Sequence, residues 1–300
     1  MSTRSGRGED AVIARLARQL RRPGADVVAG IGDDCAVVRG GARGLRLLLK
    51  TDCVVEHRHF RPSHPARAVG WKAACRAVSD IAACGGAPRF ALVTCVVRSG
   101  QTGRWLGELY RGIEAAGRQF GFHVVGGELA RTEGPAVINV ALTGDVSARH
   151  LVRRSGGRPG DVLFVTGLLG GSLVSGWHLR FRPRLAEAQW LTQNFRLRAM
   201  MDLSDGLAAD LPRLAAAGRT GFRLDAASVP RRAEASLAQA LGDGEDFELL
   251  FALAPREAVR LEAAWAKKFP RVRLTRIGAL APLGVAEGLR RMRGFDHFSP

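Results

Sequence analysis

The chain has few lysines, few aromatic residues and no long apolar run, and each shortage excludes a class of protein. Only four of its 45 basic residues are lysine, and it has one tyrosine. No apolar stretch approaches the roughly 20 residues that a membrane-spanning helix requires. The polar N-terminus lacks the apolar core of a signal peptide. These features predict a cytoplasmic protein without a membrane partner.

Cysteine is also scarce, and its spacing matches no known framework. The five cysteines are odd in number and never occur as C-x-x-C. This pattern predicts neither a disulfide framework nor a zinc site, and it is typical of a reducing compartment. Because 46% of the 300 residues are hydrophobic, the chain can bury a large core and does not need disulfide bonds or a structural metal ion to fold.

The net charge of +17 comes almost entirely from arginines that are scattered along the chain. Proteins that bind single-stranded nucleic acid interleave basic and aromatic side chains, and this pattern is missing, so nucleic acid is not the expected partner. Biased codon usage explains the arginines equally well. Attraction of phosphorylated substrates is the favoured use of this charge.

The common nucleotide-binding motifs are absent as well. The sequence contains no G-x-x-x-x-G-K-[ST], no G-x-G-x-x-G after a strand and no kinase D-F-G motif. Any ATP must therefore be held by metal ions, by glycine-loop N–H groups and by arginines. Arg154, beside the Ser155-Gly156-Gly157 turn, is the best candidate arginine, and the alternative is a solvated linker charge.

Strand and helix patterns alternate through both halves of the chain, which predicts an α/β or α+β protein. A turn-rich segment after about residue 148 suggests two domains, 1–148 and 149–300. The expected strands are 45–49, 90–97, 123–125, 136–142, 162–165, 247–253 and 272–277. The expected helices are 9–22, 65–84, 105–120, 186–192, 256–267 and one that runs through Ala217.

What the chain does contain is a series of carboxylates placed beside glycine, serine or threonine. In Gly30-Ile31-Gly32-Asp33-Asp34, adjacent side chains face opposite ways, so one acid is expected to enter a shared site. A solvated loop would explain this stretch alone, but similar acids recur. Oxygen ligands in this number suit Mg²⁺ shared with substrate phosphates, and without a cation they would repel one another. The candidates are Asp34, Asp52, Asp80, Glu128, Asp202 and Asp205, with Glu245 and Asp246 at the edge of the group.

Two of these positions have a simpler explanation. Ser204 is suited to cap the helix that follows it, and Asp205 suits the positive end of that helix. Capping does not explain Asp202.

Seven motifs, in order from residue 30 to residue 298, resemble the thiamine-monophosphate kinase family of the aminoimidazole ribonucleotide synthetase-like ATP-binding superfamily. They are Gly30–Ala36, Thr51-Asp52 with His59-Phe60, Ser79–Ala83, Arg154–Gly156 with Pro159–Asp161, Asp202–Leu207, Gly244–Leu249 and Gly294–Phe298. The resemblance implies a two-domain α+β fold. The N-terminal domains would pair into a dimeric β-barrel-like core, and a C-terminal α/β domain would complete the nucleotide and substrate site.

The resemblance also implies an activity and a set of site residues. The reaction would be direct in-line transfer of the ATP γ-phosphoryl group to thiamine monophosphate, without a nucleophilic side chain. The implied Mg²⁺ ligands are Asp34, Thr51, Asp52, Asp80, Glu128, Asp202 and Asp205. The implied ATP contacts are Lys50, Gly127, Glu128, Arg154 and Ser204, and the implied substrate contacts are His59, Glu245, Asp246 and Phe295.

Two departures from the family pattern leave alternatives open. Glu128 stands where the family usually has aspartate, and Lys50 stands where a serine commonly precedes Thr-Asp. One alternative is a kinase or ATP-dependent synthetase of the same superfamily that acts on another phosphorylated small molecule. Another is a catalytically silent basic binding protein.

Overall fold

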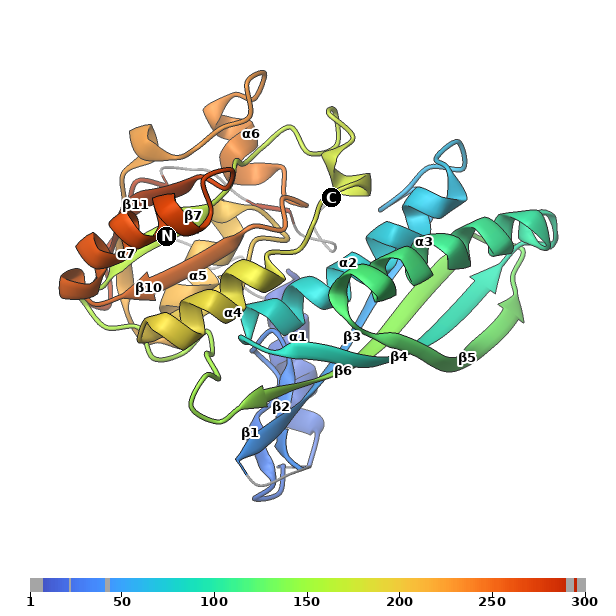
Figure 1. Cartoon of the computed structure of the whole chain (residues 1–300), viewed down its shortest axis with the longest axis horizontal. Coiled ribbons are helices and arrows are strands. Elements are labelled where there is room, and N and C mark those ends of the chain that lie inside the picture. The colour runs from blue at the N-terminus through green and yellow to red at the C-terminus, as the bar shows by residue number, and fades with distance from the viewer. Residues whose placement is uncertain (1–7, 22, 41–43, 290–293, 296–300) are drawn as a thin grey trace.

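Two six-stranded sheets, one in each half of the chain, form the framework of the molecule (Figure 1). The computed structural model describes residues 8–21, 23–40, 44–289, 294 and 295. The terminal motif predicted above therefore lies partly outside the described residues, at 296–298. Within the described ranges, no helix combines the length and apolar character needed to cross a bilayer.

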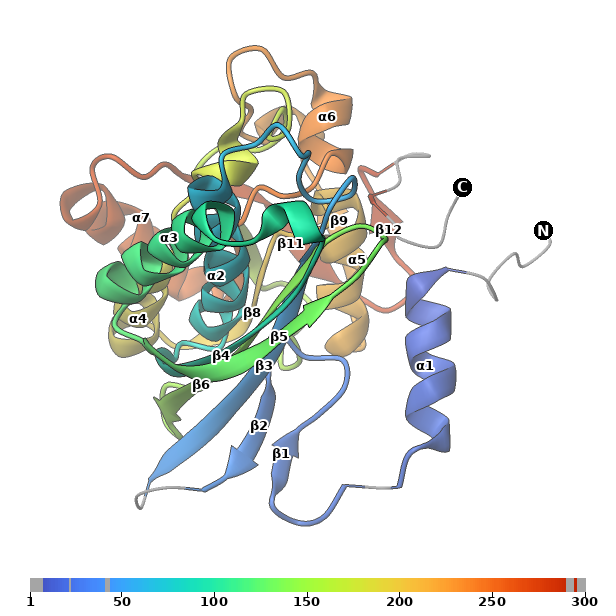
Figure 2. The same ribbon diagram turned by 90° about the vertical axis from the view of Figure 1, so that its right-hand side faces the viewer.

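The first half pairs its strands in the order β1-β2-β3-β6-β4-β5, with only β4 and β5 parallel. Its elements are α1 (Glu9–Gln19), β1 (Val27–Ala29), β2 (Ala36–Arg39), β3 (Leu45–Val55), α2 (Ala66–Ala83), β4 (Ala87–Val97), η1 (Ser99–Gln101), α3 (Arg104–Phe120), β5 (His123–Arg131) and β6 (Val137–Ser147). Helices α2 and α3 cover one face of this sheet, and no helix of the described residues packs directly on the opposite face (Figure 2).

The second half forms a sheet in the order β12-β9-β11-β7-β10-β8, antiparallel except between β12 and β9. Its elements are β7 (Val162–Thr166), η2 (Trp177–Leu179), α4 (Leu185–Asn194), β8 (Leu197–Asp202), α5 (Leu207–Ala217), β9 (Gly221–Leu224), η3 (Ala226–Ser228), α6 (Leu237–Gly242), β10 (Leu249–Leu253), α7 (Pro255–Lys268), β11 (Leu274–Ala281) and β12 (Ala286–Glu287).

Strands β7 and β10 are buried on both faces, so they read as continuous apolar runs. Alternate side chains enter two different apolar clusters because successive residues of a strand face opposite ways. Leu163 and Val165 pack with Leu211 of α5. Phe164 belongs to the larger cluster, which also contains Val78 of α2.

Helix α2 joins the two halves of the protein. It contacts β3 and β6 of the first sheet, and α4 and β8 of the second half. Most of its residues are buried, which explains why its sequence is rich in alanine and valine. Lys72, Arg76 and Asp80 of this helix are therefore held at the junction between the two sheets, whereas Arg67 near its start is exposed.

The α+β class and the two-domain aminoimidazole ribonucleotide synthetase-like fold are confirmed. The ends of four strands were wrongly predicted: β6 runs to Ser147, β11 runs to Ala281, and β3 and β5 differ most in length from their predicted ranges. Strand β3 continues past Leu49 to Val55, because each of its residues from Leu45 on pairs with β6. Strand β5 continues past Val125 to Arg131 along β4. Asp52 and Glu128 therefore lie within strands and not at strand ends. The domain boundary at residue 148 stays a prediction.

Candidate metal and phosphate site

Strand β3 and helix α2 place four charged side chains in two adjacent ion pairs. Lys50 and Asp52 share one face of the strand because they are two residues apart, and Arg76 and Asp80 share one face of the helix because they are four apart. Lys50 Nζ lies 2.9 Å from Asp80 Oδ1, and Arg76 Nη2 lies 3.0 Å from Asp52 Oδ1. The sequence periodicity of each element thus presents two acids and two cations to one another.

Three buried carboxylates from separate parts of the chain meet beside these pairs. Asp34 precedes β2, Asp80 lies in α2 and Asp202 ends β8, and each offers an oxygen within 4.8 Å of the others. We call these three residues the triad. Burial raises the pKa of Asp80 well above its usual value, and the charge of Asp202 adds to this rise, although Lys50 opposes it. Burial, followed by the charge of Asp34, raises the pKa of Asp202 to about 6.

One oxygen of the triad has no hydrogen-bond partner among the described residues. Asp34 Oδ1 accepts a hydrogen bond from Arg154 Nη2 at 2.7 Å, but the buried Asp34 Oδ2 accepts none. A buried, unsatisfied carboxylate oxygen is costly, and a divalent cation would relieve both this cost and the mutual repulsion. Carboxylate oxygens are the ligands that Mg²⁺ prefers. The triad therefore fits Mg²⁺, with Asp34, Asp80 and Asp202 as the residues that would hold it.

Neighbouring groups hold the triad in position. Ser79 Oγ donates to Asp202 Oδ2 at 2.6 Å. Asp33 Oδ1 accepts from the backbone N–H groups of Asp34 and Arg154, both at 3.1 Å. Of the two adjacent acids, Asp33 supports the turn and Asp34 joins the triad, and the role of Asp34 in a shared metal site stays a prediction.

Two of the predicted metal ligands lie away from the triad. The Thr51 side chain extends from the face of β3 opposite to Lys50, where its hydroxyl donates to Asn139 Oδ1 at 2.9 Å. Glu128 is exposed on the edge strand β5, and β6 and β4 separate that strand from β3. Within this chain, neither side chain contributes to the triad.

Two further predicted ligands are occupied by arginines. Asp52 accepts from Nε and Nη2 of Arg76. Asp205 accepts a short hydrogen bond from Arg213 Nη1. Asp34 and Asp80 also pair with cations, but Asp52 and Asp205 differ from them because they lie outside the group whose oxygens are within 4.8 Å of one another.

The predicted ATP contacts have distinct structural surroundings. Lys50 and Arg154 both touch the triad. Position 127 must be glycine because the backbone of β4 lies close to it: a Cβ at Gly127 would be 1.9 Å from the backbone oxygen of Val93. The capping role predicted for Ser204 is wrong, because α5 has Gly206 as its N-cap. The Ser204 N–H instead donates to Asp210 Oδ2 at 3.1 Å.

Two of the predicted substrate residues meet around a buried lysine that the sequence did not single out. Lys72 Nζ donates to the His59 carbonyl oxygen and to Glu245 Oε2, both at 2.6 Å. Arg76 Nη1 donates to Glu245 Oε1 at 3.0 Å. Lys72, Arg76 and Asp80 recur every fourth residue of an otherwise apolar helix, and this spacing was the available signal.

Asp246 and Phe295 occupy separate positions. Asp246 pairs with Arg232 and accepts from the Gly170 N–H at 3.1 Å, and burial raises its pKa to about 7 although Arg232 opposes this rise. The Phe295 N–H donates to the Asp205 carbonyl oxygen at 2.9 Å, and Phe295 is 42% exposed. The aromatic side chain thus lies near the Asp202–Asp205 turn with part of its surface open.

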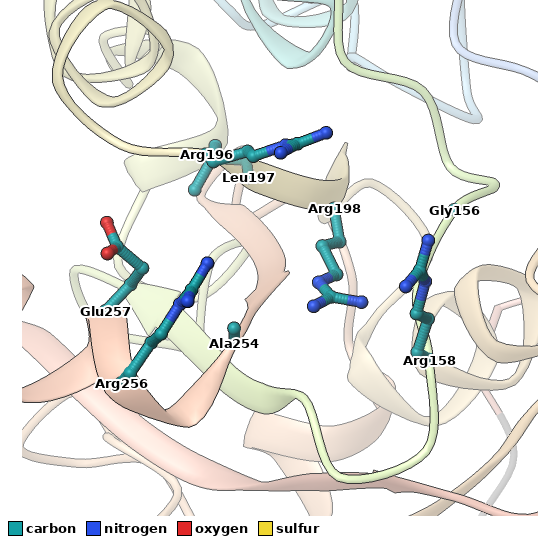
Figure 3. Close-up of a pocket in the computed structure, with 8 residues that line it drawn as sticks. All are labelled: Gly156, Arg158, Arg196, Leu197, Arg198, Ala254, Arg256 and Glu257. Carbon is teal, nitrogen blue, oxygen red and sulfur yellow. The ribbon is translucent and has the colours of Figure 1, made fainter.

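A separate cavity of about 650 Å³ opens near the start of β8 (Figure 3). Arginines dominate its walls, so its lining repels cations and attracts anions. Arg198 is the second residue of this strand and Asp202 is its last, which places the cavity and the triad at opposite ends, about 13 Å apart at 3.3 Å per residue. Its lining residues are Gly156, Arg158, Arg196, Leu197, Arg198, Ala254, Arg256 and Glu257.

The two sheets, with the triad at their junction, define the chain as an AIR synthase related protein. The family model for the N-terminal domain of such proteins matches residues 32–146, and the model for the C-terminal domain matches residues 158–278. Relatives that are at least 30% identical over more than four fifths of the chain are thiamine-monophosphate kinases, so the chain belongs to the thiamine-monophosphate kinase family.

Individual relatives extend over most of the chain. The thiamine-monophosphate kinase of Rhodopirellula baltica is 37% identical over 270 residues, which cover 84% of this chain and 83% of the relative. That of Escherichia coli K12 is 30% identical over 285 residues, 86% of each protein. Among solved structures, AaThiL complexed with AMPPCP and TMP has a TM-score of 0.82 and 27% identity, covering 99% of both chains.

Proposed function

We infer that this protein transfers the γ-phosphoryl group of ATP directly to thiamine monophosphate, which gives thiamine diphosphate and ADP. The similar AaThiL was solved with AMPPCP, an ATP analogue, and with TMP. The observation that carries the inference in this chain is the meeting of Asp34, Asp80 and Asp202, with Arg154 and Lys50 in contact. Buried acids gathered with cations at a domain junction suit the binding of a metal–nucleotide complex.

We propose that Mg²⁺ is the metal of this site. When bound, it would neutralise phosphate charge and help to align the reacting oxygens. Asp34, Asp80 and Asp202 would hold it. Arg154 orients Asp34 through its guanidinium group and braces the 30–34 turn through its backbone N–H, which donates to Asp33.

We propose that thiamine monophosphate is held near the group formed by His59, Lys72 and Glu245, with Phe295 and Asp246 as further contacts. Phe295 carries an aromatic face that is partly open and is suited to the cationic thiazolium ring. Glu245 adopts a positive φ of 55°, which non-glycine residues rarely do. Such a conformation is maintained when surrounding contacts hold it, here those from Lys72 and Arg76.

We also propose a cytoplasmic homodimer that forms through the open face of the first sheet. Three large apolar side chains of β4 and β5 are 50–58% exposed: Phe90, Leu92 and Val125. The alternate residues of β4, such as Ala91 and Val93, are buried under the helices. A contiguous apolar surface of this kind is typical of a protein interface.

The test is steady-state formation of thiamine diphosphate from thiamine monophosphate, ATP and Mg²⁺. Turnover that is lost in Asp80→Asn and retained in a surface control, Asp26→Asn, would support the proposal. Turnover only with another phosphorylated acceptor would reassign the substrate within the superfamily. Failure to consume ATP with any acceptor would favour the silent binding protein.

A further inference from the structure

We propose that Lys50 is a fixed counter-ion of the triad that takes the place of one divalent cation. The inference deepens the proposed function, because it concerns the metal content of the same site. It predicts that this chain binds fewer metal ions before nucleotide arrives than it would with a neutral residue at position 50.

The position of the Lys50 ammonium group supports this role. It lies 2.9 Å from Asp80 Oδ1, and Asp80 is one of the three acids whose oxygens lie within 4.8 Å of one another. The Lys50 side chain is only 21% exposed, so water screens its charge weakly. An ammonium group at this distance occupies the space in which a metal ion would bind Asp80 Oδ1.

The backbone around Lys50 keeps the charge in place. Strand β3 pairs with β6 over its whole length, Lys50 itself lying opposite Leu142. On the other edge of β3, Leu49, the residue before Lys50, pairs with Ala36 of β2. The strand therefore cannot move the ammonium group away without breaking these ladders, although rotation of the side chain could still redirect it.

The local charge balance leads to the same conclusion. Lys50 and Arg154 each contact one acid of the triad, which leaves one formal negative charge for metal to neutralise. The uncompensated charge belongs to Asp202, which has no ion pair among the described residues, and the unpartnered oxygen is Asp34 Oδ2. One Mg²⁺ therefore has a reason to bind between Asp34 and Asp202, whereas a second ion beside Asp80 would face the repulsion of Lys50.

The experiment measures metal binding in the absence of ATP and thiamine monophosphate. Free Mn²⁺ is followed by electron paramagnetic resonance during titration of the full chain, and melting temperatures are recorded in EDTA and in Mn²⁺. We expect Lys50→Met to bind one more Mn²⁺ per chain, or to bind Mn²⁺ about tenfold more tightly, than the wild type does. We also expect its melting temperature in EDTA to be lower than that of the wild type, because Asp80 loses its cation. Addition of Mn²⁺ should raise the melting temperature of this variant more than that of the wild type.

Three further variants separate charge from folding. Lys50→Gln keeps a hydrogen-bond donor toward Asp80 but carries no charge, so it should follow Lys50→Met and is the milder change. Lys50→Arg keeps the charge and should behave as the wild type. Lys267→Met removes an exposed lysine of α7 and should change nothing.

Unchanged Mn²⁺ number and affinity, within about twofold, in both neutral variants would overturn the proposal. So would tighter binding in Lys50→Arg, because the effect would then not depend on charge. Since no substrate is present, a failure of thiamine monophosphate phosphorylation leaves this result interpretable.

Discussion

Replacing Asp202 by asparagine should stabilise the metal-free protein while abolishing its kinase activity. Burial and the charge of Asp34 raise the pKa of Asp202 from 3.8 to about 6. At about 1.4 kcal/mol per pKa unit, its ionised form costs about 3 kcal/mol of folding free energy near neutral pH. The asparagine side chain carries no charge, and its amide oxygen could still accept the hydrogen bond from Ser79.

The sign of the pH dependence follows from the direction of this pKa change. An acid whose pKa is raised in the folded state binds more protons there than in the unfolded state. Its contribution to stability is therefore lost as the pH rises from about 4 to about 6, and the loss is constant above this range. The difference between Asp202→Asn and wild type should be small near pH 4 and largest above pH 6.

The assay is thermal unfolding in EDTA over this pH range, repeated with Mg²⁺. We expect Asp202→Asn to raise the melting temperature by roughly 6 °C near pH 7.5, and Mg²⁺ to stabilise it less than it stabilises the wild type. Asp26→Asn, which alters an exposed acid outside the triad, is the control. A fall in the melting temperature of metal-free Asp202→Asn at this pH would refute the reasoning.

Two other predictions test the junction and the open sheet. Lys72→Met should lower the free energy of unfolding by about 3 kcal/mol, because it leaves Glu245 without one of its two cations in a buried setting; urea denaturation measures this, and a loss below about 1 kcal/mol would contradict it. Leu92→Glu should convert the proposed dimer to a monomer, because it places charge on the exposed apolar face; light scattering coupled to gel filtration measures the mass, and an unchanged dimer would exclude this face as the interface.

Several elements could be predicted from local sequence because their patterns are strong. The helix expected at 65–84 is α2, Ala66–Ala83, and the strand expected at 162–165 is β7, Val162–Thr166. The ends of β3 and β5 could not be predicted in this way. Their continuations include polar residues and glycine, and pairing with neighbouring strands decides that they stay extended.

The same contrast applies to the acids. Short motifs of glycine, serine and aspartate were sufficient to select Asp34, Asp80 and Asp202, because such residues mark where a chain turns and offers oxygen atoms. No local pattern shows which of the selected acids already has a cation. Asp52 with Arg76, and Asp205 with Arg213, are pairs that only the folded chain reveals.

The sequence by itself determined the family, the two-domain α+β class that the family implies, and the list of candidate acids, since these depend on composition, periodicity and motif order. Only the tertiary structure decided which acids form the triad and which are neutralised. The physical reason is that a carboxylate can bind a metal ion or pair with a cation, and which of these groups lie nearby depends on how distant segments pack together, as β3 does against α2. Lys50 illustrates it, because its charge acquires a role only where α2 brings Asp80 to 2.9 Å.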